Sequence, residues 1–260
     1  HYYETIKQSL SLQWLSLDEA PAVLGKLIAA SSAASLLVFG FLWLAQRYLG
    51  LDYKVIYLVG GGACLVLTLF IWLAFPKFVS KTPQRKHLLL RKRYWLYYAL
   101  TFMSGARRQI FMVFAGFLMV EKFGYTLSDI AALFLINHLF NWFFAGRIGI
   151  IVGKVGERRA LVFEYCGLLC VFTAYAFVNS ANWAGALYVV DHLFFSLAIA
   201  IKTYFQKIAD PADIASTAGV AFTINHIAAV VIPVLFGLVW LISPMWVFLA
   251  GSVMALISLA

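Results

Sequence analysis

The stretch Gly-Ile-Ile-Val-Gly-Lys-Val-Gly-Glu-Arg-Arg, residues 149–159, decides the fold of this 260-residue chain. It joins two apolar segments, residues 127–152 and 160–178, and each is long enough to cross a bilayer as a helix. We therefore expect a short basic hairpin between two membrane-spanning helices, with residues 153–159 forming its loop. The alternative interpretation of the stretch, taken alone, is an ordinary basic cytoplasmic loop.

The composition indicates an all-α, polytopic membrane protein. Hydrophobic residues make up 63% of the chain and charged residues 12%, whereas a soluble domain is roughly half apolar and a quarter charged. The mean hydropathy is +0.89. The long continuous apolar segments do not fit the short alternating strands of a β-barrel. The net charge of +9 does not indicate a nucleic-acid partner, because the basic residues gather in loops between the spans.

The distribution of basic residues also predicts the orientation. Residues 77–93 carry Lys and Arg but no acid, which places this segment, and with it the loop 153–159, in the cytoplasm. The preferred interpretation is a solvated loop that sets the topology, and binding of anionic lipid headgroups is the alternative. We expect about eight full spans after a partial helix in residues 1–15. The expected spans are 22–46, 55–75, 94–120, 127–152, 160–178, 183–208, 214–242 and 246–260.

The chain contains an internal repeat. Ile6-Lys7 precedes Phe39-Gly40-x-x-Trp43-Leu44, and Ile201-Lys202 precedes Phe236-Gly237-x-x-Trp240-Leu241 at a nearly constant offset. Parallel repeats of this kind are typical of transporters built from two related halves.

Together, the hairpin and the repeat resemble the major facilitator superfamily. The signature loop of that family reads Gly-x-Leu-Ala-Asp-Arg/Lys-x-Gly-Arg/Lys-Arg/Lys. Gly153 and Glu157 depart from its acidic position and one basic position, which suits the weaker copy between helices 8 and 9 of the family. The matching residues, which the resemblance implies form a conformational loop motif, are Gly149, Ile151, Lys154, Gly156, Arg158 and Arg159.

The resemblance also implies a division of the chain into three parts. Residues 1–76 would be the end of an N-terminal six-helix bundle, with part of helix 4 and helices 5 and 6. Residues 77–93 would be the linker, and residues 94–260 the C-terminal bundle of helices 7–12. The chain starts at His1 without an initiator Met or a signal-peptide pattern, so we expect a fragment, a processed product or a chain whose first part is missing. Alternatively, another chain supplies or replaces the first helices.

Ionisable residues inside spans are functional candidates, because their burial in the membrane is costly. Arg107 and Arg108 lie past the middle of span 94–120. Helical spacing joins Arg108 to Ser104 and Thr101 in one polar face. We therefore predict that Arg108 faces a substrate cavity, since helix 7 of the family lines one, and that Arg107 lies on its flank. The alternative is that both arginines snorkel or pair with helix carbonyl groups.

A second set of candidates comprises Asp191, His192 and Lys202. Eleven residues separate Asp191 from Lys202, so they are expected on nearly the same helix face. We predict that Arg108 pairs with Asp191, as a gate, a proton-coupling pair or a static structural pair. His192 is a candidate for proton coupling and for substrate binding, because histidine titrates near neutral pH.

Lys202 and Lys7 occupy equivalent positions in the repeat. With Arg108 they would attract an organic anion or a phosphate, unless both lysines snorkel to the cytoplasmic surface. We expect Glu164 to pair with Arg158 or Arg159 and to take part in gating.

No motif indicates an enzyme, a cofactor or a metal site: the sequence has no Walker loop, no zinc-ligand spacing and no nucleophile elbow. Cys64, Cys166 and Cys170 lie in apolar runs and are interpreted as small hydrophobic residues. The predicted function is secondary active transport of a small solute in an inner or plasma membrane, by alternating access and with proton coupling. An organic anion or zwitterion is the preferred solute, and membrane lipid is the other expected partner. The alternative is a transporter-derived protein that no longer transports and serves as a structural or assembly subunit.

Overall fold

The computed structural model describes the whole chain except residues 1, 51, 75–81 and 86. Within this part the chain is helical and contains no strand. Its first three helices are α1 (Tyr2–Trp14), α2 (Ala20–Leu49) and α3 (Tyr53–Ala74). After the segment 82–91 come η1 (Lys92–Tyr94), α4 (Trp95–Gln109), η2 (Ile110–Ala115), α5 (Gly116–Phe123), α6 (Leu127–Val155), α7 (Glu157–Phe177), α8 (Ala181–Phe195), η3 (Ser196–Ala198), α9 (Ile199–Ile208), η4 (Pro211–Asp213), α10 (Ile214–Ile242) and α11 (Pro244–Leu259).

Six helical stretches of the described chain are long and apolar enough to cross a membrane. They confirm the predicted polytopic helical class. The two other expected spans, 94–120 and 246–260, are not among these stretches. In the first, the π-helical turn η2 interrupts α4–α5. The second corresponds to α11, which has 16 residues. The end of the second expected span, at residue 75, lies outside the described part. The qualifying stretches are Ala20–Leu42, Lys54–Ala74, Ser128–Val155, Glu157–Phe177, Ala181–Ile208 and Pro211–Ile242.

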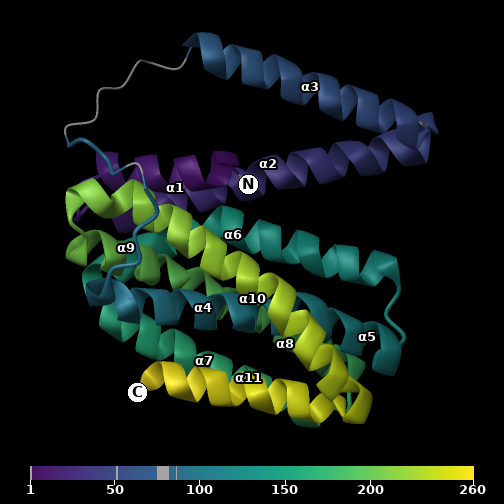
Figure 1. Cartoon of the computed structure of the whole chain (residues 1–260). Coiled ribbons are helices and arrows are strands. Elements are labelled where there is room, and N and C mark those ends of the chain that lie inside the picture. Colours follow the sequence, from purple (N-terminus) through teal and green to yellow (C-terminus); the bar gives the residue numbers. More distant parts are fainter. Residues whose placement is uncertain (1, 51, 75–81, 86) are drawn as a thin grey trace.

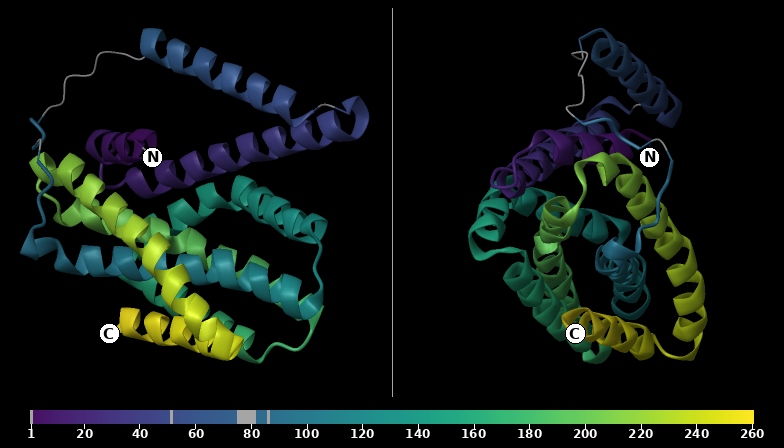
Figure 2. Two further views of the ribbon diagram at one scale, coloured as in Figure 1. Left: turned by 45° about the vertical axis from the view of Figure 1, so that its right-hand side comes forward. Right: turned by 60° about the vertical axis from the view of Figure 1, so that its left-hand side comes forward.

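The helices from α4 onward form a bundle; the first part of α2 packs on it, and the remainder of α2 and α3 extend away from it (Figure 1). Viewed nearly end on, α6, α7, α10 and α11 surround α4 and α8 (Figure 2, right). The α3 window Lys54–Ala74 has no residue buried against the rest of the described chain. The first three helices contact the bundle through α1, which packs on α9 and α10, and through α2, which packs on α6 and α9.

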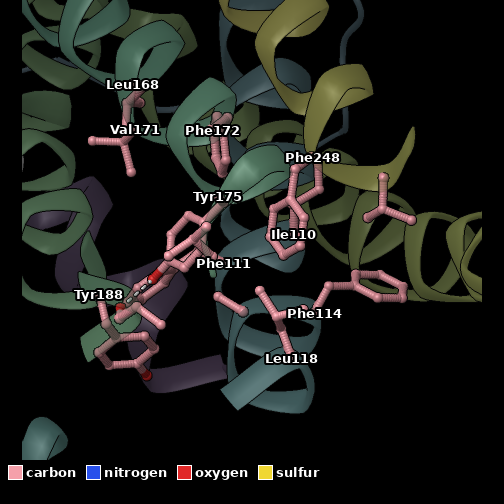
Figure 3. Packing of buried hydrophobic residues seen from close by; sticks show 14 of the residues in the cluster. Ile110, Phe111, Phe114, Leu118, Leu168, Val171, Phe172, Tyr175, Tyr188 and Phe248 are labelled. Carbon is pink, nitrogen blue, oxygen red and sulfur yellow. Dashed lines mark hydrogen bonds between the residues drawn. The ribbon is translucent and has the colours of Figure 1, made fainter. Parts of the chain in front are cut away.

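Two apolar clusters stabilise this arrangement. The larger one joins η2, α5, α7, α8 and α11, and Figure 3 shows its aromatic centre. There Phe111 packs against Tyr188 with ring centroids 4.4 Å apart, and Tyr175 stacks on Phe248 at 5.0 Å. The second cluster includes Leu12 of α1 and Leu24 of α2 together with residues of α4, α7 and α9, so it joins the first helices to the bundle.

Helices α2 and α6 cross at two glycines. A Cβ atom on Gly149 would overlap the carbonyl oxygen of Pro21, and one on Gly25 would overlap the carbonyl oxygen of Ala145. Small residues permit such close backbone approach between helices in a membrane. Gly149, the first residue of the hairpin motif, is therefore a packing position against α2.

The predicted loop 153–159 is wrong in extent. Helix α6 continues to Val155 and α7 begins at Glu157, so Gly156 alone separates them. Its φ of +89° is a conformation that side-chain-bearing residues rarely adopt. Gly156 therefore forms a one-residue turn where a longer loop was expected. Lys154, Arg158 and Arg159 are exposed beside it.

The segment 82–91 is fixed to the start of α10 by the buried carboxylate of Asp213. Arg85 and Arg91 form ion pairs with it at 3.0 and 2.6 Å, and the Tyr94 hydroxyl donates to it at 3.0 Å. The Ser216 hydroxyl donates to the His87 carbonyl, which adds a second connection. Part of the predicted basic linker is therefore engaged by protein groups and is not simply solvated; residues 77–81 and 86 lie outside the described part.

We predict that Gly149→Ala destabilises the contact between α2 and α6, because the added methyl group meets backbone atoms that cannot rotate away. Overpacking typically costs about 1–3 kcal/mol, which outweighs the gain of up to ~1 kcal/mol from replacing glycine within a helix. Thermal unfolding of the purified protein measures the change. Gly146→Ala is the matched control, since its Cβ atom would meet only Lys26 Cγ at 3.7 Å. Equal stability of the two variants would contradict the prediction.

Candidate functional site

Arg107 is fully buried inside the bundle. Its Nη1 atom donates to Ser258 Oγ of α11 at 2.6 Å, and its Nη2 atom lies 3.9 Å from Glu164 Oε1 of α7. Its guanidinium group stands 4.4 Å from the centre of the Tyr165 ring, a cation–π distance. Helices α4, α7 and α11 therefore meet at one buried positive charge.

Asp191 adds a second buried carboxylate from α8. It lies within electrostatic range of both Arg107 and Glu164. Its side chain is fully buried, and neither of its carboxylate oxygens has a hydrogen-bond partner among the described residues. Arg107, Glu164 and Asp191, which we call the buried ionic cluster, thus combine one basic group with two acidic groups.

A second charged group is more accessible, with Arg108 and Lys202 exposed and Lys7 half-buried. Lys202 of α9 is solvent-exposed and lies within electrostatic range of Arg108, Lys7 and Glu4. Arg108 is also exposed. The members of this group come from α1, α4 and α9, so it lies where the first helices face the bundle. Arg108, Lys202 and Lys7, which we call the basic group, carry three positive charges against the single acid Glu4.

His192 lies between the two sets of charges. Its Nε2 atom is 2.8 Å from Asn141 Nδ2 of α6, and Ser196 donates to Asn141 Oδ1 at 3.2 Å. Arg108 is within electrostatic range of His192, and Asp191 precedes His192 in α8. These contacts hold the imidazole near Arg108 of the basic group. In the sequence His192 directly follows Asp191 of the buried ionic cluster.

The environment predicted for Arg107 is wrong, whereas the prediction that Arg108 faces a substrate cavity stays a prediction. Arg107, expected on the flank, is the buried residue near Asp191, whereas Arg108 is exposed. The predicted pairing of Arg108 with Asp191 is therefore wrong. The polar face on which that prediction rested does exist on α4, but a longer apolar face lies on the same helix. Helical spacing places Arg107 in line with Leu100, Phe111 and Phe114, which are all buried, and that pattern was the signal for a buried arginine.

Glu164 pairs with Arg107, so its expected pairing with Arg158 or Arg159 is also wrong. It lies more than one helical turn beyond these exposed arginines and projects into the bundle. Nor do Asp191 and Lys202 share a helix face, since the first is buried and the second exposed. The turn of 3₁₀-helix η3 lies between them and changes the helical phase that the prediction assumed.

The architecture and the charged side chains inside its spans define a polytopic α-helical membrane protein. The family model of the Major Facilitator Superfamily matches residues 8–233. The chain therefore belongs to this superfamily.

The comparison with curated proteins gives one distant relative, an uncharacterized MFS-type transporter of Methanocaldococcus jannaschii. It is 27% identical over 128 residues, which are 49% of this chain and 32% of the relative. The chain thus spans about a third of the length of the curated relative that it matches.

We predict that Arg107→Met strongly destabilises the bundle, because it leaves Glu164 and Asp191 buried without a cation. Removing one member of a buried ion pair typically costs about 3–5 kcal/mol. Arg108→Met makes the same chemical change at an exposed neighbour and should alter stability by about 0.5 kcal/mol or less. Thermal unfolding of both variants in detergent provides the comparison. If Arg108→Met costs as much as Arg107→Met, the assignment of the buried charge is wrong.

Proposed function

We propose that this chain is part of a secondary active transporter that moves a small solute by alternating access, coupled to protons. The observation that carries the proposal is the close association of two sets of charges, one buried and one more accessible. Membership of the Major Facilitator Superfamily supports transport in general. The same membership favours the predicted absence of enzymatic activity.

The basic group supports an anionic or zwitterionic solute. Lys202 lies within electrostatic range of both Arg108 and Lys7, and Glu4 offsets one of the three positive charges. Clustered charges of one sign in a low-dielectric surrounding concentrate ligands of the opposite sign. An organic acid or a phosphate would supply the missing negative charge, with His192 as a further hydrogen-bonding group beside it.

The buried ionic cluster supports proton coupling. Its three members are fully buried, and one guanidinium balances only one of the two carboxylates. A buried charge without a partner is costly, so the cluster is neutral when the other carboxyl group carries a proton. Release of that proton would require a rearrangement around Arg107. We assign proton coupling to Asp191 and Glu164, with His192 as the neighbouring titratable group.

The α2–α6 crossing supports a gate. It joins the first helices to the bundle through backbone contacts at Gly25 and Gly149. Next to it, Gln206 of α9 donates to the carbonyl oxygens of Leu12 and Leu15, at 3.0 and 2.8 Å. Both contacts lie at the end of the bundle that carries the hairpin motif, which we propose is cytoplasmic. Their separation would open the pathway on that side.

The solute class can be tested by thermal-shift measurements with organic acids, phosphates, amino acids, sugars and cationic drugs. A ligand that binds the folded state raises its apparent stability. We expect an anion to stabilise the parent protein and to lose most of that effect with Arg108→Ala. Arg147→Ala removes another exposed arginine, on α6, and should leave the effect intact. Stabilisation by sugars or cations alone would contradict the proposed solute class.

Proton coupling is tested separately, in proteoliposomes. We expect Asp191→Asn to abolish solute accumulation driven by a pH gradient while solute exchange at equal pH continues, because the variant carboxamide cannot take up or release a proton. Glu164→Gln is the parallel variant on the other side of Arg107. If both variants still accumulate solute in response to a pH gradient, the buried ionic cluster is not the coupling site.

A further inference from the structure

An apolar groove lies on the outer face of the bundle, between α7 and α8. Phe163, Cys166, Cys170 and Ala174 line it from α7, and Val190 and Phe194 line it from α8. Its volume is about 440 Å³. Gly167 lets the two helices approach, since a Cβ atom there would overlap the Phe194 ring. The groove lies on two stretches that meet the criteria for membrane spans, and it is separate from both charged sets.

The lining restricts what can occupy the groove. An apolar cavity does not retain water, because water molecules in it would lack hydrogen-bond partners. An empty groove would forfeit dispersion contacts along its walls. In a bilayer the adjacent molecules with matching chemistry are lipid acyl chains.

The groove runs along the middle part of α7. From Phe163 to Ala174 the helical rise gives about 16 Å, a length comparable with the ~15 Å of half a hydrocarbon core. Because α7 extends from Glu157 to Phe177, the groove begins inside the first end of the span and passes its midpoint. An acyl chain that enters from that end would fill the first part of the groove.

A basic side chain stands at the surface end of the groove. Arg159 is exposed and begins the stripe that continues through Phe163, Cys166 and Cys170 at helical spacing. It precedes Phe163 by one helical turn, which is the position of a lipid headgroup above its acyl chain. Arg158 is equally exposed but lies about 100° away around the helix.

We infer that this groove binds an anionic phospholipid, with its headgroup phosphate at Arg159 and one acyl chain along α7. The charge of Arg159 selects the headgroup, and the apolar groove holds the chain. This site differs from the basic linker, in which Arg85 and Arg91 pair with Asp213 and Arg93 donates to the Ile208 carbonyl.

The test uses the protein in nanodiscs of phosphatidylcholine that contain a trace of lipid with a photoreactive acyl chain. The probe lipid is either phosphatidylglycerol or phosphatidylcholine, and mass spectrometry maps the labelled peptides. Labelling of residues 163–174 is normalised to that of α3, whose span window is not covered by the rest of the described chain. We expect phosphatidylglycerol to label the groove about five-fold more than phosphatidylcholine, the ratio corresponding to one basic residue near a membrane surface.

Variants separate the headgroup contribution from that of the groove. Arg159→Gln should bring the ratio close to one, whereas Arg158→Gln, which removes the same charge from another face, should keep most of it. Cys170→Trp fills the groove and should reduce its labelling by both lipids, while Cys64→Trp on α3 should not. Equal labelling by the two lipids in the parent protein, or a preference that survives Arg159→Gln, overturns the inference. So does groove labelling that Cys170→Trp leaves unchanged.

Discussion

The buried guanidinium of Arg107 is the constraint on which the bundle depends. An isolated charge in an apolar interior costs many kcal/mol, so the protein must surround it with compensating groups. Glu164 of α7 and Ser258 of α11 lie within 3.9 and 2.6 Å of it, Asp191 of α8 lies within electrostatic range, and the Tyr165 ring covers one face. These groups come from three other helices. Four helices therefore have to occupy defined positions around a single side chain, a requirement that non-directional apolar packing does not impose.

The aromatic core also holds several helices in defined positions, through apolar contacts. Phe111 and Phe114 follow Arg107 on one face of the helix, and their rings pack against α8 and α10, respectively. The turn of π-helix η2 begins within this face, directly after α4. π-Turns are often found at functional sites, where they adjust the direction of side chains. The guanidinium group of Arg107 and the aromatic cluster thus contact some of the same helices, so a rearrangement around Arg107 would also change the packing of the core.

The span pattern could be predicted because lipid leaves the backbone few options: each polar backbone group must be satisfied within the segment. This constraint predicts the long apolar helices, but it does not predict that Gly156 alone separates α6 from α7. Periodicity alone does not decide the burial of Arg107, because a polar stripe through Arg108 and an apolar stripe through Leu100 and Phe111 lie side by side on the same helix. The opposite environments of Asp191 and Lys202 depend on η3, and the sequence Ser-Leu-Ala of that segment is equally compatible with a regular helix. Single departures from α-helical geometry do not alter hydropathy, yet they change which face a side chain occupies.

Arg107 and Arg108 show how adjacent residues of like charge acquire different roles. A rotation of about 100° between consecutive helical residues points one toward α7 and α8 and leaves the other exposed beside Lys202. Both belong to one turn of α4, so in the proposed cycle a movement of that turn on anion binding at Arg108 would also move Arg107. In the proposed transport cycle this shared turn is the physical link between solute and proton. It requires no chain of intermediate contacts, since the two charges are one residue apart.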